Sequence, residues 1–155
     1  MLEILYPRRC AVCDEIEVTG KGICPLCKDK VHVAGEPACK KCGKPLVDER
    51  KEFCTDCGKK HHVYTQGKAV FVYEGGIRNS MYRFKYGNKR EYAEFYANAA
   101  VEKYGVWLNK IKAEVLIPIP MYSRKKRLRG YNQAEVFARE LGRKAGILVD
   151  EHLVR

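Results

Sequence analysis

Residues 10–58 read CAVCDEIEVTGKGICPLCKDKVHVAGEPACKKCGKPLVDERKEFCTDCG and hold all eight cysteines of the chain. The cysteines form four Cys-x-x-Cys pairs, with ten, eleven and eleven residues between successive pairs. A Cys-x-x-Cys turn lets two sulfurs converge on one ion while backbone amides of the turn donate to them. Eight such ligands suit two tetrahedral zinc sites, and the predicted ligands are Cys10, Cys13, Cys24, Cys27, Cys39, Cys42, Cys54 and Cys57.

The four pairs can be grouped around two ions in two ways. Sequential grouping is favoured because each gap fits a hairpin, and each half is then expected to be a zinc ribbon, two knuckles joined by a short β excursion. Cross-braced grouping, first pair with third and second with fourth, satisfies the same count and stays open. Gly43 and Gly58 follow directly after a pair and suit the backbone turn that presents amides to sulfur.

Both zinc ions are expected to be structural, because four cysteines leave no open position for catalysis. Met1–Arg9 lacks the apolar stretch of a secretory signal, and no apolar run reaches the length of a membrane span, so we expect a cytoplasmic protein without membrane insertion. Thiols stay reduced there, which disfavours disulfides, and four pairs do not suit a thioredoxin-like redox site. The histidines are not needed as ligands and are expected elsewhere, His61 and His62 at the surface.

The charge of the chain favours contact with phosphates. The formal net charge is +11; eight thiolates contribute −8 and two Zn²⁺ ions +4, which leaves +7 in the metal-loaded state. Good solubility is the alternative explanation, and charge alone does not separate the two.

Two units are expected along the chain. Residues 1–60 have little apolar content besides cysteine and need metal to fold. Residues 68–155 can build an apolar core, with these expected elements: a strand at 68–73, a helix through Ile77, Met81 and Phe84 that stops near Gly87, a helix from about Ala93 to Gly105, and a buried strand at 113–120.

The end of the chain predicts a βαβ unit of a parallel sheet. A basic loop, Ser123–Gly130, follows the strand at 113–120. Asn132 can cap the next helix, Glu135 gives capping-box spacing, and Gly146 ends the helix before a strand at 147–149. The fold class is therefore α+β and α/β, a small metal-held unit before an incomplete parallel core.

The whole chain resembles the ComF family of competence proteins. The resemblance is carried by the four cysteine pairs and by three further motifs, Phe84-Lys85-Tyr86-Gly87, Pro118-Ile119-Pro120 and Arg129-Gly130-Tyr131-Asn132-Gln133. It implies a double zinc ribbon before a type I phosphoribosyltransferase-like domain, and a link to uptake of single-stranded DNA in natural transformation. It also implies that residues 117–122 contact pyrophosphate and residues 124–132 face phosphates.

One motif of that fold is absent. Its ribose-phosphate site has two adjacent acids followed by a Thr-Thr-Gly turn, and this sequence has no such segment. The chain is therefore expected to be C-terminally truncated or completed by another chain. We expect no catalytic residues and no catalysis by these residues alone, so phosphoribosyl pyrophosphate is a possible cofactor only for a longer form.

Three functions remain as hypotheses. The first is binding of single-stranded DNA in DNA uptake, the second a phosphoribosyltransferase-like enzyme, and the third a zinc-ribbon module that docks a helicase-like or other uptake protein. A basic run before a capped helix favours phosphate contact over a merely solvated loop. The predicted phosphate- or nucleic-acid-binding residues are Arg124, Lys125, Lys126, Arg127, Arg129, Gly130, Asn132 and Gln133.

Four tyrosines at near-helical spacing are expected to pack in the core rather than to stack on bases. They are Tyr82, Tyr86, Tyr92 and Tyr96.

Overall fold

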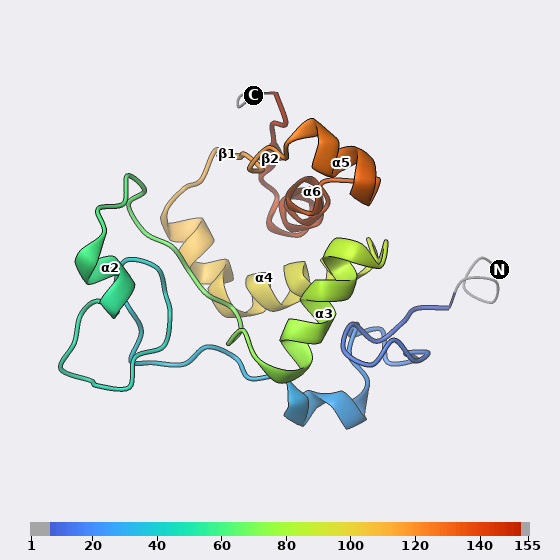
Figure 1. Ribbon diagram of the computed structural model, residues 1–155, viewed down its shortest axis with the longest axis horizontal. Coiled ribbons are helices and arrows are strands. Elements are labelled where there is room, and N and C mark those ends of the chain that lie inside the picture. Colours follow the sequence, from blue (N-terminus) through green and yellow to red (C-terminus); the bar gives the residue numbers. More distant parts are fainter. Residues whose placement is uncertain (1–6, 153–155) are drawn as a thin grey trace.

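A computed structural model describes residues 7–152, so residues 1–6 of the first predicted unit and 153–155 of the second lie outside the described residues. Figure 1 shows the elements in chain order. They are η1 (Pro25–Lys30), α2 (Thr55–Lys59), α3 (Gly75–Tyr86), α4 (Tyr92–Lys110), β1 (Val115–Leu116), α5 (Ser123–Arg129), α6 (Gln133–Ala145) and β2 (Leu148–Val149). Within residues 7–152, every helix is too short or too polar to cross a membrane.

The two halves of the cysteine-rich region repeat one local structure. In each half an antiparallel bridge joins the ends of a short loop, residues 9–16 in the first and 38–45 in the second. In each half the second knuckle starts a short helix with a cysteine as N-cap, Cys24 before η1 and Cys54 before α2. The predicted β excursion between knuckles is therefore wrong, because the β pairing encloses the first knuckle and the second is helical.

Helix α3 has the predicted extent, and α4 is longer than predicted. The α3 helix ends at Tyr86, directly before Gly87. The α4 helix was expected to end at Gly105 but continues to Lys110. A glycine inside a helix costs only about 1 kcal/mol, and Leu108 beyond it packs against the apolar cluster of α4 and α6, which offsets that cost.

Aromatic rings fill the core between α3 and α4. The Phe84 and Tyr96 rings lie 5.5 Å apart, and Phe71 stacks on Phe95 at 5.4 Å. The buried Tyr96 hydroxyl has a partner, Ser80 Oγ at 2.6 Å. Because these rings come from α3, α4 and the segment before α3, one cluster fixes all three.

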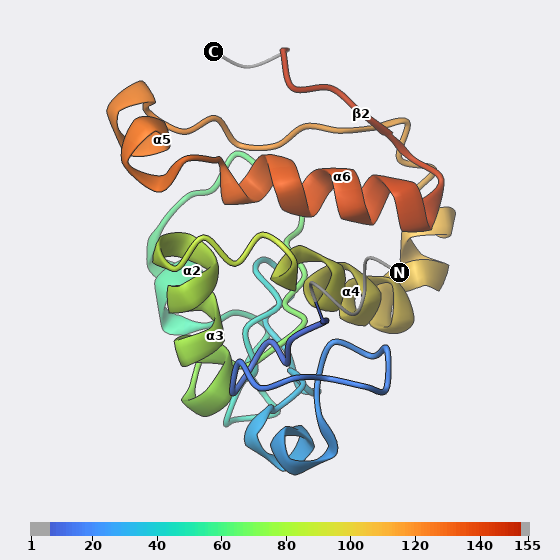
Figure 2. The same ribbon diagram turned by 90° about the vertical axis from the view of Figure 1, so that its right-hand side faces the viewer.

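The last part of the chain has the predicted βαβ order on two parallel strands. Val115 pairs with Leu148 and Leu116 with Val149. Figure 2 shows α6 lying across α4, with β2 and α5 on the far side of α6. After the cysteine-rich region, the described chain is mostly helical and contains this small parallel sheet. A phosphoribosyltransferase-like core stays a prediction.

The two ends of α6 follow the sequence prediction. The Asn132 side chain caps the helix by accepting a hydrogen bond from Ala134 N at 3.0 Å, and Gly146 ends it with a left-handed φ of 68°. The capping box itself is not formed as expected. Glu135 accepts from the Asn132 side-chain amide at 3.3 Å, because that amide group turns toward the carboxylate and takes the place of a backbone N–H.

Two predicted strands are shorter or absent in the described chain. Residues 68–73 make only one bridge, Phe71 with Val33, and the pairing there is limited to two backbone hydrogen bonds, Ala34 N to Val70 O and Val72 N to His32 O, both 2.9 Å. Residues 113–120 contain only the two residues of β1, and they are not the buried strand expected. Ile117 is 44% exposed and Ile119 79%, because neither has a packed layer above it among the described residues.

Candidate metal centres and basic surface

The eight sulfurs form two clusters, and the grouping is sequential. Within each cluster the sulfur atoms all lie within 4.8 Å of one another. The members are Cys10, Cys13, Cys24 and Cys27 in the first cluster, here called site 1, and Cys39, Cys42, Cys54 and Cys57 in the second, here called site 2. Cross-braced grouping is therefore wrong for this chain.

The sulfur geometry fits tetrahedral zinc. Tetrahedral Zn–S bonds of about 2.3 Å place sulfurs about 3.8 Å apart. The Cys13 and Cys24 sulfurs lie 3.7 Å apart in site 1, and those of Cys42 and Cys54 lie 3.8 Å apart in site 2. None of the eight cysteines is in a disulfide, and these sulfur distances are well above the bond length of about 2.05 Å. Both clusters therefore fit one structural zinc ion each, with no ligand position left for substrate.

The first cysteine of each site is prepared to be a thiolate. In site 1 the backbone N–H groups of Val12 and Cys24 each donate to Cys10 Sγ at 3.4 Å. Burial alone would raise the pKa of Cys10, but hydrogen bonds from the backbone of Cys24, Cys13 and Val12 lower it to about 7. In site 2 burial is likewise outweighed by backbone donors, and the pKa of Cys39 falls to about 6. Because zinc binds thiolates, these two residues are ready ligands.

The residue that directly follows the first Cys-x-x-Cys pair has a left-handed backbone conformation in both halves. Asp14 has a φ of 68° and Gly43 a φ of 74°. Gly58 was expected to serve the same purpose, and this is wrong. Gly58 lies inside α2, because the second knuckle of each half is helical and needs no left-handed residue.

Site 1 is built into the helical body. Ala11, between the first two ligands, is fully buried in the same apolar cluster as the α3 and α4 rings. The Tyr92 hydroxyl donates to Asp14 Oδ1 at 2.7 Å, and Lys89 Nζ reaches the same oxygen at 2.8 Å. Burial would raise the pKa of Asp14, but Lys89 and Tyr92 together lower it, so the carboxylate stays charged.

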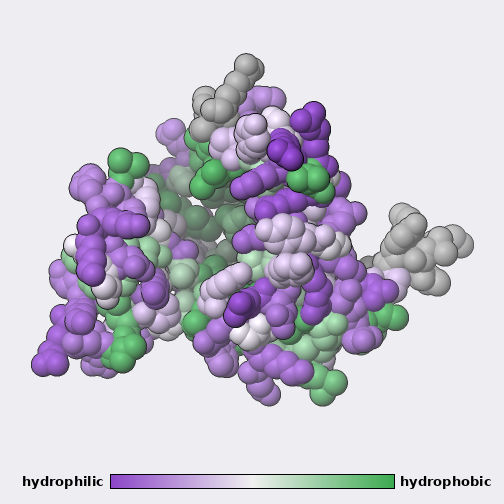
Figure 3. Space-filling model, in the orientation of Figure 1, coloured by the Kyte–Doolittle hydropathy of each residue, from purple (hydrophilic) through white to green (hydrophobic). Residues whose placement is uncertain are grey.

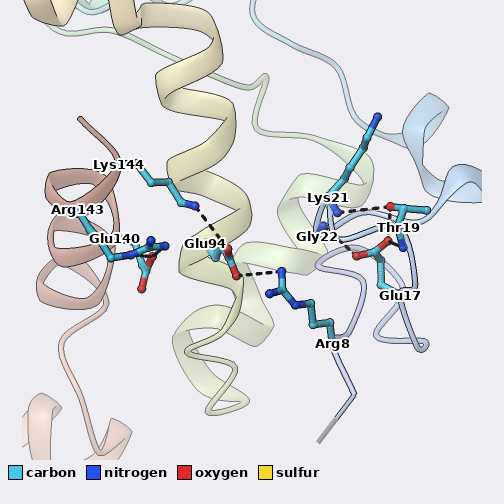
Figure 4. Close-up of polar contacts among 9 residues, drawn as sticks. All are labelled: Arg8, Glu17, Thr19, Lys21, Gly22, Glu94, Glu140, Arg143 and Lys144. Carbon is cyan, nitrogen blue, oxygen red and sulfur yellow. Dashed lines mark hydrogen bonds and ion pairs between the residues drawn. The ribbon is translucent and has the colours of Figure 1, made fainter. Parts of the chain in front are cut away.

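Further polar contacts hold the loops of site 1, as Figure 4 shows. Glu94 on α4 pairs with Arg8 at 3.7 Å and with Lys144 of α6 at 3.4 Å, so it connects the chain before site 1 to two helices. Glu17 is buried and accepts from the backbone N–H groups of Thr19 at 2.5 Å and Gly22 at 3.1 Å. These bonds fix the loop between the two knuckles of site 1.

Site 2 stands apart from that body. No residue between 36 and 66 belongs to any of the apolar clusters of the described chain. Its links run along the connecting segment, where Gly67 N donates to Lys41 O at 2.6 Å and Gln66 Nε2 to Lys40 O at 3.2 Å. In Figure 1, α2 and its loops lie to one side of the helices, whereas the first half lies against α3.

Among the described residues, no histidine belongs to either sulfur cluster. His32 Nδ1 lies 2.7 Å from Glu74 Oε1 at the exposed N-cap of α3. His61 is exposed as predicted, and His62 is partly covered and packs its ring 5.1 Å from that of Tyr64.

The predicted basic loop is a helix, α5, because Ser123–Arg129 contains no β-branched residue and ends in a left-handed Gly130 with a φ of 76°. Of the eight predicted phosphate-binding residues, five lie on α5 and the other three lie between its end and the start of α6, and they differ in whether they have partners within the fold. Asn132 is 1% exposed, caps α6 and donates to Ile119 O at 3.0 Å, so it is occupied within the fold. Lys126 Nζ lies 2.9 Å from both oxygens of Glu135 and is neutralised there.

Arg129 and Gln133 bind each other. Arg129 Nη1 donates to Gln133 Oε1 at 3.0 Å. The same guanidinium lies 4.6 Å from the ring centroid of Tyr86 and donates to the Tyr86 hydroxyl at 3.0 Å. The end of α5 is therefore fixed to the end of α3.

Three cations of α5 are exposed and unpaired. Arg124, Lys125 and Arg127 make no side-chain hydrogen bond or ion pair with any residue in the described part of the chain. Gly130, at the end of the same helix, is also exposed, but its carbonyl accepts from Arg90 Nη2 at 3.1 Å. The structure therefore separates three available charges from five predicted residues that have other partners or roles.

The four tyrosines divide into two pairs. Tyr92 and Tyr96 on α4 are buried, as expected for core residues. Tyr82 and Tyr86 on α3 are 64% and 59% exposed, so the expectation of core packing is wrong for them. Spacing of four along a helix places residues on one face but does not say whether that face meets the core.

An apolar hollow is lined by residues of α3, α4 and α6 and of the segment before α3. Figure 3, in the orientation of Figure 1, shows apolar side chains at the bottom of a hollow near the middle of the molecule. Its volume is about 320 Å³, and almost all of its lining is aliphatic or aromatic. The sequence did not indicate it, because its lining residues have the same pattern as core residues. They are Val70, Phe71, Tyr73, Ile77, Met81, Phe84, Tyr96, Gln133 and Phe137.

Comparison with known proteins agrees with the sulfur geometry. No curated protein and no solved structure matches the chain. No family specific to ComF proteins or to phosphoribosyltransferases matches it either. The family described as Double zinc ribbon domain matches residues 1–58, which span both cysteine clusters. The chain therefore begins with a double zinc ribbon domain that holds two Cys₄ sites.

Proposed function

We propose that this protein binds single-stranded nucleic acid through the free cations of α5, in a ComF-like role in DNA uptake. The observation that carries the proposal is a set of three exposed cations on one short helix that have no partner among residues 7–152, Arg124, Lys125 and Arg127. Free cations near a surface attract phosphates without first breaking an internal ion pair. The zinc ions have no direct part in this proposal, since closed Cys₄ sites only hold the fold.

The neighbouring helix extends the positive surface. Helices α3 and α5 meet where Arg129 contacts Tyr86, and Figures 1 and 2 both show them side by side at that end. Neither helix contains an Asp or a Glu. Lys126 is paired with Glu135 of α6, and one guanidinium nitrogen of Arg83 is buried. The other basic residues of the two helices are Arg78, Lys85, Arg124, Lys125, Arg127 and Arg129. A surface with cations on two adjoining helices and no acid within them favours a polyanion over a single phosphate.

The salt dependence of binding tests the α5 cations. Binding of a labelled oligothymidylate to the zinc-loaded chain should weaken steeply as salt rises, because each phosphate contact releases counterions. Changing Arg124, Lys125 and Arg127 to Ala should make the slope of log K against log salt shallower by about 2, at about 0.7 for each lost contact with a single strand. Fluorescence anisotropy at several salt concentrations measures both slopes.

A charge-matched variant supplies the control. Lys51, Lys59 and Lys60 are three exposed lysines of the second ribbon half. Changing them to Ala removes the same charge from a different surface and should leave the slope nearly unchanged. Equal changes in slope for the two triple variants would show a diffuse charge effect and would rule out α5 as the contact.

A phosphoribosyltransferase-like enzyme is a second candidate with one observation in its favour. Residues 117–122 leave the carboxyl end of β1, and ligands of open parallel sheets bind outside such ends. Because the acidic Thr-Thr-Gly segment is absent from this sequence, we expect calorimetric titration of phosphoribosyl pyrophosphate to show no binding to this chain. A clear isotherm would mean that other residues hold the ribose phosphate and would favour the enzyme.

A further inference from the structure

Two tyrosines of α3 form an exposed aromatic pair beside the basic surface. Tyr82 and Tyr86 lie four residues apart, and their ring centroids are 5.0 Å apart at an angle of 44°. Each residue keeps more than half of its surface exposed, at 64% and 59%. Exposed large aromatic residues in adjoining positions are more unusual than a single one and indicate a contact surface.

Core packing does not account for this pair. The aromatic cluster between α3 and α4 contains Phe84, Tyr92 and Tyr96, but neither Tyr82 nor Tyr86 belongs to it. The ring contacts of the exposed pair are with each other and with the Arg129 guanidinium, 4.6 Å from the Tyr86 centroid. Arg129 thus adds a third flat group beside the two exposed rings.

One cation of α3 lies in the same row as the two tyrosines, and a second lies next to Tyr86 in the sequence. Arg78 lies four residues before Tyr82, so the sequence of the helix places Arg78, Tyr82 and Tyr86 in one row, with a step of about 6 Å along the axis. Arg78 and Lys85 make no side-chain hydrogen bond or ion pair with the described residues. The row therefore has a cation at one end, two adjoining aromatic rings in its middle, and the Arg129 guanidinium at its other end.

We propose that Tyr82 and Tyr86, with Arg129, form a stacking platform for unpaired nucleobases. The platform rests on the proposed function and gives it a ligand class: a single strand whose phosphates reach the α5 cations and whose bases stack on α3. Aromatic rings and guanidinium planes stack on bases of any sequence, and cations beside them hold the backbone. Paired bases are hidden in the duplex stack, so a duplex offers this platform no exposed base face.

Three labelled probes separate stacking from charge, all tested with the full zinc-loaded chain. They are an oligothymidylate, an abasic deoxyribose-phosphate strand of the same length, and a duplex. Changing both Tyr82 and Tyr86 to Ala should weaken binding of the oligothymidylate by about tenfold or more, since stacking typically contributes about fivefold or more for each base and two rings are lost. Binding of the abasic strand and of the duplex should change less than about twofold.

Two variants control for the loss of a ring and for the hydroxyl groups. Tyr73 is 63% exposed, about as much as Tyr82, but it lines the apolar hollow and is not part of the exposed pair. Tyr73→Ala should leave all three probes unaffected. Changing Tyr82 and Tyr86 to Phe keeps both rings and should keep base-dependent binding. Far-UV circular dichroism confirms that each variant is folded, as expected for exposed side chains.

The outcomes distinguish this platform from the proposed function. If the Ala variant weakens the abasic strand as much as the oligothymidylate, the platform is wrong while charge-based binding stands. If the native chain binds no probe at all, the proposed function fails and the platform fails with it. Tight binding of the duplex that equals binding of the single strand would also overturn the platform.

Discussion

Replacing Cys10 by Ser is expected to unfold most of this protein, whereas the equivalent change of Cys39 to Ser should remove a zinc ion and leave the helices folded. Both cysteines are almost fully buried, are the first ligands of their sites and have a lowered pKa. The two substitutions therefore remove chemically equivalent zinc ligands. Their different results should follow from what surrounds each site.

The surroundings of site 1 make its zinc part of the helical core. Ala11 lies in the cluster of α3 and α4 rings, Val12 is 6% exposed, and a side chain added at Gly76 of α3 would meet Val12 Cγ1 at 2.8 Å. Tyr92 is 1% exposed, and its hydroxyl donates to Asp14 of the same knuckle. Without zinc, the two cysteines of the knuckle are no longer bound to one ion, so Ala11 and Asp14 lose their fixed positions against α3 and α4.

The magnitudes support a large effect. Structural zinc contributes about 10–16 kcal/mol in small zinc-binding peptides near neutral pH, while a whole domain is stable by only about 5–15 kcal/mol. Losing the ion at site 1 therefore removes an amount comparable to the total stability of the part that depends on it. Site 2 belongs to none of the described apolar clusters, so its loss should stay local.

Zinc content and helicity together measure this difference. Each variant should bind one zinc ion in place of two, and only Cys10→Ser should lose the far-UV circular dichroism of its helices. Cys39→Ser should unfold thermally within a few degrees of the native chain in that signal. Native helicity in Cys10→Ser would show that α3, α4 and α6 form a core without zinc, contrary to the packing of Ala11 and Tyr92.

Local signals in the sequence were sufficient for several parts of the fold. Cysteine spacing predicted the sequential sites, and Asn132 and Gly146 predicted both ends of α6. These features depend on a few neighbouring residues, since a cap or a Cys-x-x-Cys turn makes its bonds within the same segment. The same reasoning failed where distant contacts decide. Gly105 was expected to end α4, but packing of Leu108 continues the helix.

The candidate binding surface shows the same limit. The basic run at residues 124–129 was visible in the sequence, but its division into free and paired cations was not. Lys126 is paired only because Glu135 of α6 comes within 2.9 Å, and Arg129 is occupied because Tyr86 of α3 comes within reach. Exposure of Tyr82 likewise depends on which face of α3 meets α4. Such facts belong to tertiary structure and have no local signal.

Gly43→Ala should weaken zinc binding at site 2 strongly, whereas Gly58→Ala should not. Both glycines directly follow the second cysteine of a Cys-x-x-Cys pair in the same ribbon half. Gly43 has a φ of 74°, and an added Cβ would lie 2.6 Å from the backbone nitrogen of Ala69. An added Cβ on Gly58 meets nothing within 4 Å, and Gly58 lies inside α2 with ordinary helical backbone.

Two costs combine at Gly43. A left-handed alanine costs about 1–2 kcal/mol, and displacing the connecting segment at Ala69 adds a similar amount, so the total is about 2–4 kcal/mol. At about 1.4 kcal/mol for each factor of ten, zinc affinity at site 2 should fall by about 30- to 1,000-fold. Gly58→Ala should leave it unchanged or slightly stronger, because alanine favours a helix over glycine by about 1 kcal/mol.

Competition with a zinc chelator measures both affinities in the full chain, and site 1 serves as an internal reference that neither change should alter. Asp14 shows why the position itself does not require glycine. It occupies the same left-handed place in site 1 with a φ of 68°, and its side chain has room and a partner in Tyr92. At Gly43 the backbone of Ala69 occupies that space. If Gly43→Ala binds zinc as well as Gly58→Ala, the second ribbon is not held against the connecting segment at Ala69.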